Sequence, residues 1–127
     1  MRIVVKGEVC SGNKIGRVLG YPTANIVVGE EMNIKNGVYA ARVEVEDKWY
    51  GAMAYLGVRP TVSGDGARVL EANIFEFDRD IYGFTITVEL LDFIRGEERF
   101  ASLDILKAQL SKDKKTIEDI LEKISVE

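Results

Sequence analysis

Apolar and polar residues alternate along most of residues 2–95, as expected of β-strands that bury one face. The alternation is clearest over residues 38–46, where one predicted face carries Tyr39, Ala41, Val43 and Val45. Similar runs predict further strands over residues 2–9, 49–58, 69–77 and 84–95, with a hairpin turn at Asp47 and Lys48. The pattern slips between Leu90 and Leu91, which predicts a β-bulge in the last strand.

The periodicity changes after Ser102, a suitable N-cap residue for a helix. Leucines then recur at helical spacing up to Leu110, and an isoleucine-rich stripe from Ile117 to Ile124 predicts a second helix. Short strands followed by terminal helices indicate an antiparallel barrel or a sandwich with helical cover. A length of 127 residues suits a single domain over 1–127, with strands over about 2–95 and a helical tail over about 102–125.

The amino-acid composition excludes several kinds of catalytic and metal site. The chain has no histidine and a single cysteine, Cys10, which excludes serine–histidine triads and the usual histidine or cysteine metal sites. Proton abstraction would therefore fall to a carboxylate, a lysine or a tyrosine. A carboxylate together with a metal bound by oxygen ligands is the combination that phosphoryl transfer uses.

The charge balance and the apolar runs suggest a compartment and partners. A net charge of −4 and a pI near 5.0 argue against nucleic-acid binding, although a local site for one nucleotide is compatible with them. One cysteine cannot form a disulfide within the chain, and no apolar run approaches the length of a membrane span or a leader. We therefore expect a soluble cytoplasmic protein without nucleic-acid or membrane partners. A monomer is a separate expectation that these observations do not test.

The segment GRVLGYPTAN, residues 16–25, concentrates the candidate chemistry. Its glycines allow close approach of the backbone to a ligand, and Pro22 stiffens the chain before Thr23 and Asn25. These two residues lie two apart and so face the same way on an extended segment. Their oxygens suit a Mg²⁺ ion that already carries nucleotide phosphates. A tight turn leading into a strand explains the same spacing, and the segment alone does not separate the two interpretations.

Four later segments follow this motif, and their order and separation along the chain are informative together with it. They are GVYAARVEV (37–45), YLGVRPT (55–61), LEANIFEFDRDIYG (70–83) and FIRGEERFASLDIL (93–106). From about Gly7 to about Asp113, the chain resembles the riboflavin kinase (flavokinase) family of bacterial and eukaryotic type. Its members occur alone or as the C-terminal half of bifunctional FAD synthetases. Two departures are Asn73, often histidine in the family, and Glu76 with Phe77, where a DF pair is frequent.

The resemblance implies a fold and an activity. The fold would be a mainly β, six-stranded antiparallel Greek-key barrel with C-terminal helices packed outside. The activity would be that of a riboflavin kinase, which transfers the γ-phosphate of Mg–ATP to the ribityl 5′-hydroxyl of riboflavin to give FMN and ADP. The alternative is a catalytically silent flavin- or nucleotide-binding regulatory module on the same barrel. FAD synthesis is not expected, because the sequence holds no nucleotidylyltransferase half.

Glu71 is the predicted catalytic base. Leu70, Ala72 and Ile74 form an apolar face, so Glu71 and Asn73 should point together to the other side of their strand. A solvated glutamate on an outer strand face is the plainer interpretation of that pattern. The resemblance favours catalysis, because the family's catalytic glutamate falls on this position.

The resemblance also implies the substrate and metal contacts. Mg²⁺ would be bound by Thr23 and Asn25, which together with Gly12, Gly16, Arg17, Ile74 and Tyr82 would contact the nucleotide. The flavin would lie against Arg95, Glu98 and Phe100, although a solvated approach to the helix explains that charged cluster as well. Residues 10–20 and 59–68 could be ordinary surface loops, but they flank the motif residues, so we interpret them as flaps over the substrates. Phe75, Phe77, Tyr82 and Phe84 are open to a second interpretation, as core aromatics.

Overall fold

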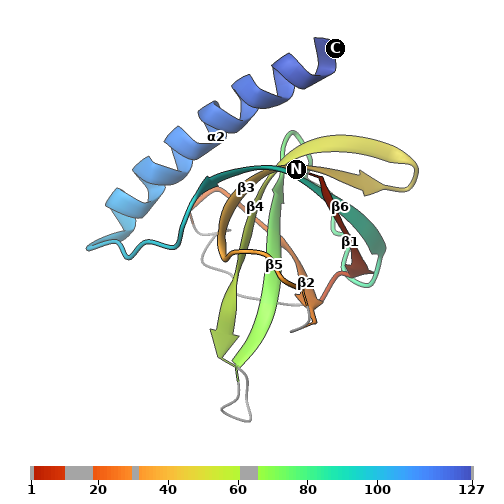
Figure 1. Ribbon diagram of the computed structural model, residues 1–127, viewed down its shortest axis with the longest axis horizontal. Helices are drawn as coiled ribbons and strands as arrows, with labels where there is room; N and C mark the ends of the chain where they lie inside the picture. Colours follow the sequence, from red (N-terminus) through yellow and green to blue (C-terminus); the bar gives the residue numbers. More distant parts are fainter. Residues whose placement is uncertain (1, 11–18, 30–31, 61–65, 127) are drawn as a thin grey trace.

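The computed structural model describes residues 2–10, 19–29, 32–60 and 66–126 (Figure 1). Its strands and helix are β1 (Ile3–Glu8), β2 (Ala24–Val28), β3 (Gly37–Val45), β4 (Lys48–Pro60), β5 (Gly66–Ile74), β6 (Thr85–Arg95) and α2 (Leu103–Val126). All strand pairs are antiparallel, in the order β1-β6-β3-β4-β5-β2. Strands β3, β4 and β5 follow one another as neighbours, and β2 lies beside β5. This is a Greek-key arrangement, as predicted.

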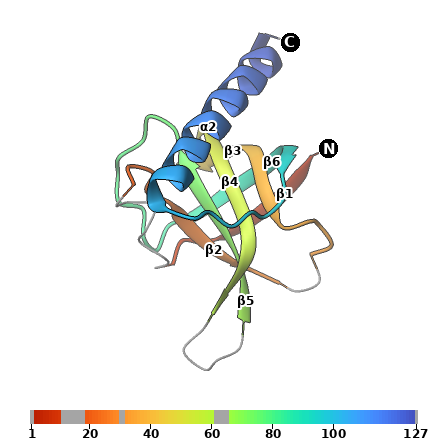
Figure 2. The same ribbon diagram turned by 90° about the vertical axis from the view of Figure 1, so that its left-hand side faces the viewer.

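The sheet curls until its two edge strands approach each other, so the barrel is nearly closed (Figure 2). Beyond the end of β1, the amide of Cys10 donates a hydrogen bond to the carbonyl oxygen of Asn25 in β2, at 2.8 Å. Gly7 in β1 permits this approach, because a Cβ atom there would lie 2.4 Å from Cγ2 of Ile26. The barrel interpretation is therefore correct, and the sandwich left open by the strand pattern is not formed.

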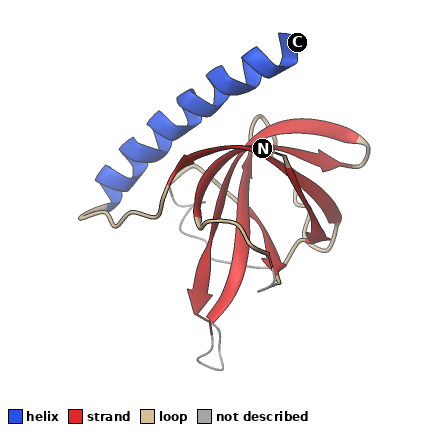
Figure 3. Cartoon of the chain, viewed as in Figure 1, coloured by secondary structure: helices blue, strands red, loops and turns tan. Residues whose placement is uncertain are grey.

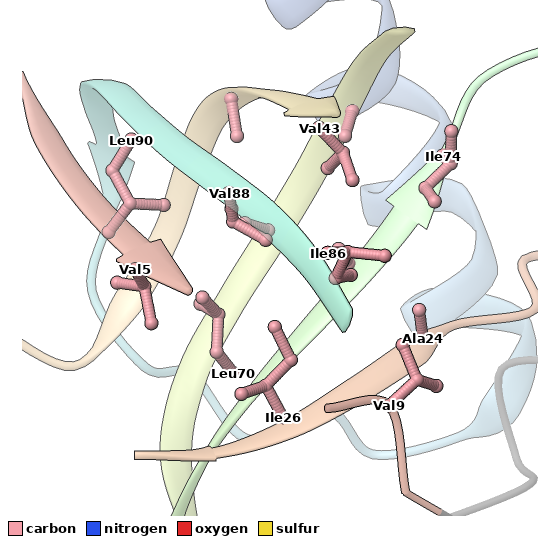
Figure 4. Close-up of a cluster of buried hydrophobic side chains, with 14 of the residues drawn as sticks. Val5, Val9, Ala24, Ile26, Val43, Leu70, Ile74, Ile86, Val88 and Leu90 are labelled. Carbon is pink, nitrogen blue, oxygen red and sulfur yellow. The ribbon is translucent and has the colours of Figure 1, made fainter. Parts of the chain in front are cut away.

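Inward-facing residues of the strands fill the barrel (Figure 4). The predicted face of β3 belongs to this core in full, as do Leu70, Ala72 and Ile74 of β5 and Ile86, Val88 and Leu90 of β6. The predicted bulge is also present: Ala41 pairs with Leu90 while Ala40 pairs with Asp92, which leaves Leu91 as the extra residue. The bulge lets β6 keep its apolar side chains inside while it curves.

Two element boundaries differ from the positions predicted from the sequence. The hairpin turn lies at Glu46 and Asp47, both with positive φ, as two-residue turns between twisted strands require. Strand β5 ends at Ile74 and not at Phe77, because Glu76 also takes a positive φ of 53° and turns the chain. Of the four aromatics, Phe77 and Phe84 pack against the barrel core and Phe75 packs against a second core under the helix, whereas Tyr82 is exposed.

Helix α2 crosses the outer face of the β3–β4 hairpin, as expected (Figure 3). Ile117 of the helix packs there with Val38, Ala40 and Met53. Ser102 caps the helix, because its hydroxyl oxygen accepts a hydrogen bond from the amide of Ile105 at 3.2 Å.

The prediction of two helices is wrong, since the tail is one helix through Val126. Residues 111–116 contain no glycine or proline to break it, and Thr116 donates to the carbonyl of Lys112 within the continuing helix. In the part of the chain that the structure describes, no helix has the length and apolar character needed to span a bilayer.

Candidate active site

A row of cross-strand neighbours connects the predicted site residues. Asn25 of β2 pairs with Glu71 of β5, Glu71 pairs with Tyr55 of β4, Tyr55 with Val38 of β3, and Val38 with Arg95 of β6. Directly paired residues of antiparallel strands project to the same side of the sheet, with Cβ atoms about 5 Å apart. The row alternates with core residues, so it lies on the outside of the barrel, toward α2.

A cavity of about 250 Å³ opens over this row, between the barrel wall and the start of α2. We call it the helix-side cavity. The predicted base and the predicted flavin contacts lie together at this cavity. Its lining includes Glu71, Arg95, Glu98 and Phe100. The rest of the lining is Leu19, Tyr21, Thr23, Val38, Met53, Tyr55, Asn73, Leu106 and Leu110.

Glu71 is buried, with 8% of its surface exposed. The interpretation as a solvated glutamate is therefore wrong, because this carboxyl group faces a cavity under the helix and not bulk water. Its neighbour Asn73 is equally buried, and its side-chain amide donates a hydrogen bond to the carbonyl oxygen of Pro22 at 2.9 Å. Asn73 thereby holds the segment that carries Thr23 against β5, a role that the sequence analysis did not assign.

Thr23 and Asn25 form the candidate metal site. The side-chain amide of Asn25 donates to the carbonyl oxygen of Thr23 at 3.2 Å, which points its Oδ1 atom away from that bond. Asn25 is 5% exposed, and among the described residues its buried Oδ1 has no hydrogen-bond partner. A buried oxygen without a partner costs free energy unless something binds it. Such an oxygen next to a threonine fits Mg²⁺, which prefers oxygen ligands.

A second cavity, of about 530 Å³, lies at the turn that follows β5, and we call it the turn-side cavity. Thr23 lines both cavities. The predicted nucleotide contact Ile74 belongs to the turn-side lining, together with Pro22, Ala24, Ala72, Phe77, Asp78, Arg79, Asp80 and Ile81.

Tyr82 does not reach either cavity. Its side chain is 65% exposed, and its backbone amide is held by a hydrogen bond to the Asp80 carboxylate at 3.0 Å. The aromatic residue that lines the turn-side cavity is Phe77, which sequence analysis treated as a core candidate. Gly12, Gly16 and Arg17, predicted along the phosphates, lie outside the described residues, as do most of the predicted flap 10–20 and half of the predicted flap 59–68.

Arg95 is engaged within the protein. Its guanidinium donates to both carboxylate oxygens of Asp113 in α2, at 2.9–3.2 Å, and the side chain of Gln109 also donates to that carboxylate. The guanidinium carbon lies 5.5 Å from the ring centre of Phe100. Arg95 is thus no solvated side chain, and Asp113, only 3% exposed, is a residue that the sequence analysis missed.

Comparison with known proteins shows the family to which the chain belongs. The flavokinase family, described as riboflavin kinase, matches residues 1–121. The chain belongs to the riboflavin kinase family. A bifunctional riboflavin kinase/FMN adenylyltransferase from Haemophilus influenzae is 41% identical over 111 residues, which are 87% of this chain and 36% of that protein. An RNA-binding riboflavin kinase from Bacillus subtilis is 40% identical over 110 residues, 87% of this chain and 47% of that protein.

Solved structures show the same fold. A structure described as riboflavin kinase from Trypanosoma brucei aligns with a TM-score of 0.69 at 26% identity, over 96% of this chain and 81% of that one. A structure described as a macrolide-efflux protein from Streptococcus pneumoniae aligns with a TM-score of 0.80 at 42% identity, over 91% and 38%. The chain spans between about a third and a half of the two curated relatives above. Family and fold are therefore shown by proteins that are mostly longer than this chain.

Proposed function

We propose that this chain is an ATP:riboflavin 5′-phosphotransferase, which moves the γ-phosphate of Mg–ATP to the ribityl 5′-hydroxyl of riboflavin and releases FMN and ADP. Membership of the riboflavin kinase family supports the class of reaction. The observation that carries the proposal is the position of Thr23, which lines both cavities. Transfer of a phosphoryl group needs two substrates to meet at one point, and the two cavities share a wall at this residue.

The flavin is assigned to the helix-side cavity. Apolar and aromatic walls with a few polar groups at the edge suit a flat tricyclic ring. Tyr21 and Phe100 supply aromatic walls, while Arg95 and Glu98 supply polar edges. The nucleotide is assigned to the turn-side cavity, which is the larger of the two and adjoins the segment with the candidate metal ligands.

Glu71 would act as the general base. As the ribityl oxygen forms its bond to the γ-phosphorus, the bond from that phosphorus to ADP breaks and the hydroxyl proton passes to the Glu71 carboxylate. A positioned base contributes about 10²- to 10⁴-fold to such a step. Burial of Glu71 supports this role, because Glu71 lines the proposed flavin cavity and is the cross-strand partner of Asn25, a candidate metal ligand.

Thr23 and Asn25 would hold the magnesium ion through their side-chain oxygens. When bound with ATP, the ion would supply neutralisation of phosphate charge and orientation of the γ-phosphate. Both ligands are neutral, so they would bind the ion mainly as part of Mg–ATP. Asn25 would keep its oxygen available for this purpose through the bond of its amide nitrogen to Thr23.

The direct test is chromatography of riboflavin incubated with the protein, ATP and Mg²⁺. FMN should form only in the complete mixture, and neither without ATP nor with excess EDTA. If folded protein binds riboflavin but forms no FMN with any divalent metal or nucleoside triphosphate, the chain is the silent flavin-binding module and the proposal is wrong.

A further inference from the structure

The linker between β6 and α2, residues 96–102, carries two residues of the helix-side cavity, Glu98 and Phe100. Its two ends are held by the Arg95–Asp113 pair and by the Ser102 cap described above. Glu98 itself is exposed, and the linker contains no helix or strand of its own. Phe100 also has the contact of its ring with the Arg95 guanidinium, so it is above all the position of Glu98 that depends on whatever holds the middle of the linker.

Tyr55 of β4 provides that contact. Its hydroxyl group donates a hydrogen bond to the Glu97 carboxylate at 2.6 Å, and Glu97 lies directly before Glu98. In the register of the sheet, Tyr55 is paired with Glu71 on one side and with Val38 on the other. One side chain thus reaches from the strand next to the candidate base to the linker that carries the flavin contacts.

Gly57 makes this side-chain conformation possible. A Cβ atom at residue 57 would lie 2.4 Å from the Tyr55 hydroxyl oxygen and 2.6 Å from two ring carbons. The ring of Tyr55 therefore lies directly over Gly57, in space that any other residue would occupy. No such constraint exists at Gly96, where a Cβ atom would meet nothing within 4 Å.

We propose that Tyr55 is a positioning residue for the flavin, which acts by holding Glu97 so that Glu98 and Phe100 stay against the helix-side cavity. The inference rests on the proposed function, because it takes riboflavin as the occupant of that cavity. It assigns Tyr55 no part in proton transfer or metal binding. Loss of the hydroxyl should therefore weaken riboflavin binding and leave the chemical step at saturating substrate nearly unchanged.

The test is the dissociation constant of riboflavin, read from quenching of flavin fluorescence. Tyr55→Phe keeps the ring and removes the hydroxyl, and we expect binding to weaken about three- to tenfold, the range of one hydrogen bond. Glu97→Ala should weaken binding equally, whereas Glu97→Gln should bind almost as wild type because its amide oxygen still accepts. The double variant Tyr55→Phe/Glu97→Ala should bind no worse than either single variant.

Glycine variants test the same contact without touching either partner. Gly57→Ala should weaken riboflavin binding by displacing the Tyr55 ring, and Gly96→Ala is its matched control with room for the added methyl group. The Michaelis constant for ATP should stay constant in every variant, and thermal unfolding should confirm that each is folded.

The results separate the inference from the function on which it rests. Wild-type affinity in Tyr55→Phe, or losses that simply add in the double variant, would overturn the positioning role while wild-type FMN formation stands. Absence of riboflavin binding by the wild-type protein would overturn both proposals.

Discussion

Successive side chains of β5 face opposite sides of the sheet, toward the barrel core or toward the candidate active site. Leu70, Ala72 and Ile74 face the barrel core, while Glu71 and Asn73 face the helix-side cavity. A shift of the strand register by one residue would bury both polar side chains in the barrel and expose the apolar ones. The register that builds the core therefore also places the candidate base.

Replacement of Glu71 tests the base at the level of a single group. Glu71→Gln keeps the size of the side chain but removes the proton acceptor, so kcat should fall by roughly two orders of magnitude or more. Riboflavin affinity should change little. Steady-state kinetics at saturating riboflavin and ATP measure the loss. Glu118→Gln, on the exposed face of α2, is the control, and an unchanged kcat in Glu71→Gln would leave the reaction without this base.

Replacement of the candidate metal ligands should affect turnover far more than folding. Thr23→Val removes the hydroxyl oxygen at nearly constant volume, and Asn25→Leu removes the buried Oδ1. We expect a large loss of kcat that excess Mg²⁺ does not fully restore, because the ligands also orient the phosphates. Thr23→Ser, which keeps a hydroxyl, should retain much of the activity. The measurements are kcat as a function of Mg²⁺ concentration and the midpoint of thermal unfolding. Near-wild-type turnover in Thr23→Val or Asn25→Leu would show that the metal binds elsewhere.

Helix α2 is joined to the barrel by apolar packing and by the buried Arg95–Asp113 ion pair. Ile117 of the helix packs against the outer face of the barrel. One turn earlier, Asp113 binds the Arg95 guanidinium at the end of β6. Leu106 and Leu110, from the first half of the helix, line the helix-side cavity. The helix therefore contributes both to stability and to the shape of the proposed flavin site.

Breaking the Arg95–Asp113 pair should destabilise the fold. Asp113→Leu leaves the guanidinium without its buried partner, and we expect the free energy of unfolding to fall by about 3 kcal/mol in urea titrations. The double variant Arg95→Met/Asp113→Leu should recover much of this loss, because no charge is then left unpaired. If the double variant is less stable than Asp113→Leu, the pair is not the link between strand and helix.

At the scale of the whole molecule, two cavities meet at Thr23, and the proposed function assigns one substrate to each. Phe100→Ala removes a stacking surface from the helix-side cavity, so the KM for riboflavin should rise several-fold and the KM for ATP should change little. Phe77→Leu, in the turn-side cavity, should show the reverse. Steady-state kinetics with each substrate varied in turn measure the difference. If Phe100→Ala affects only ATP, the two assignments must be exchanged.

The net charge of the whole chain is relevant to whether it binds nucleic acid. One relative is named for RNA binding, but a net charge of −4 gives this chain little electrostatic attraction for a polyphosphate backbone. The expectation that it binds no nucleic acid therefore stays a prediction from charge.

The sequence by itself determined most of the strands and the residue types available for chemistry, although neither β2 nor the single helix followed from its pattern. Alternation at period two predicted the strands, the inward face of β3 and the bulge at Leu91, because a strand buried on one side constrains every second residue. The lack of histidine left carboxylates among the few candidate bases, and the family resemblance selected Glu71 as the candidate base and Thr23 and Asn25 as candidate metal ligands. These features depend on residues close together in the chain, so local patterns contain them.

Only the tertiary structure decided which residues meet. Asn25, Glu71, Tyr55 and Arg95 become neighbours through the pairing of four strands and the closure of the barrel, which no local pattern encodes. Asp113 lies in a polar stretch that looked like a break between helices, and only the end of β6 beside it explains its burial. The outward turn of Tyr82 and the tyrosine ring over Gly57 likewise follow from contacts in three dimensions. Long-range pairing turned a set of suitable residue types into two cavities with a shared wall.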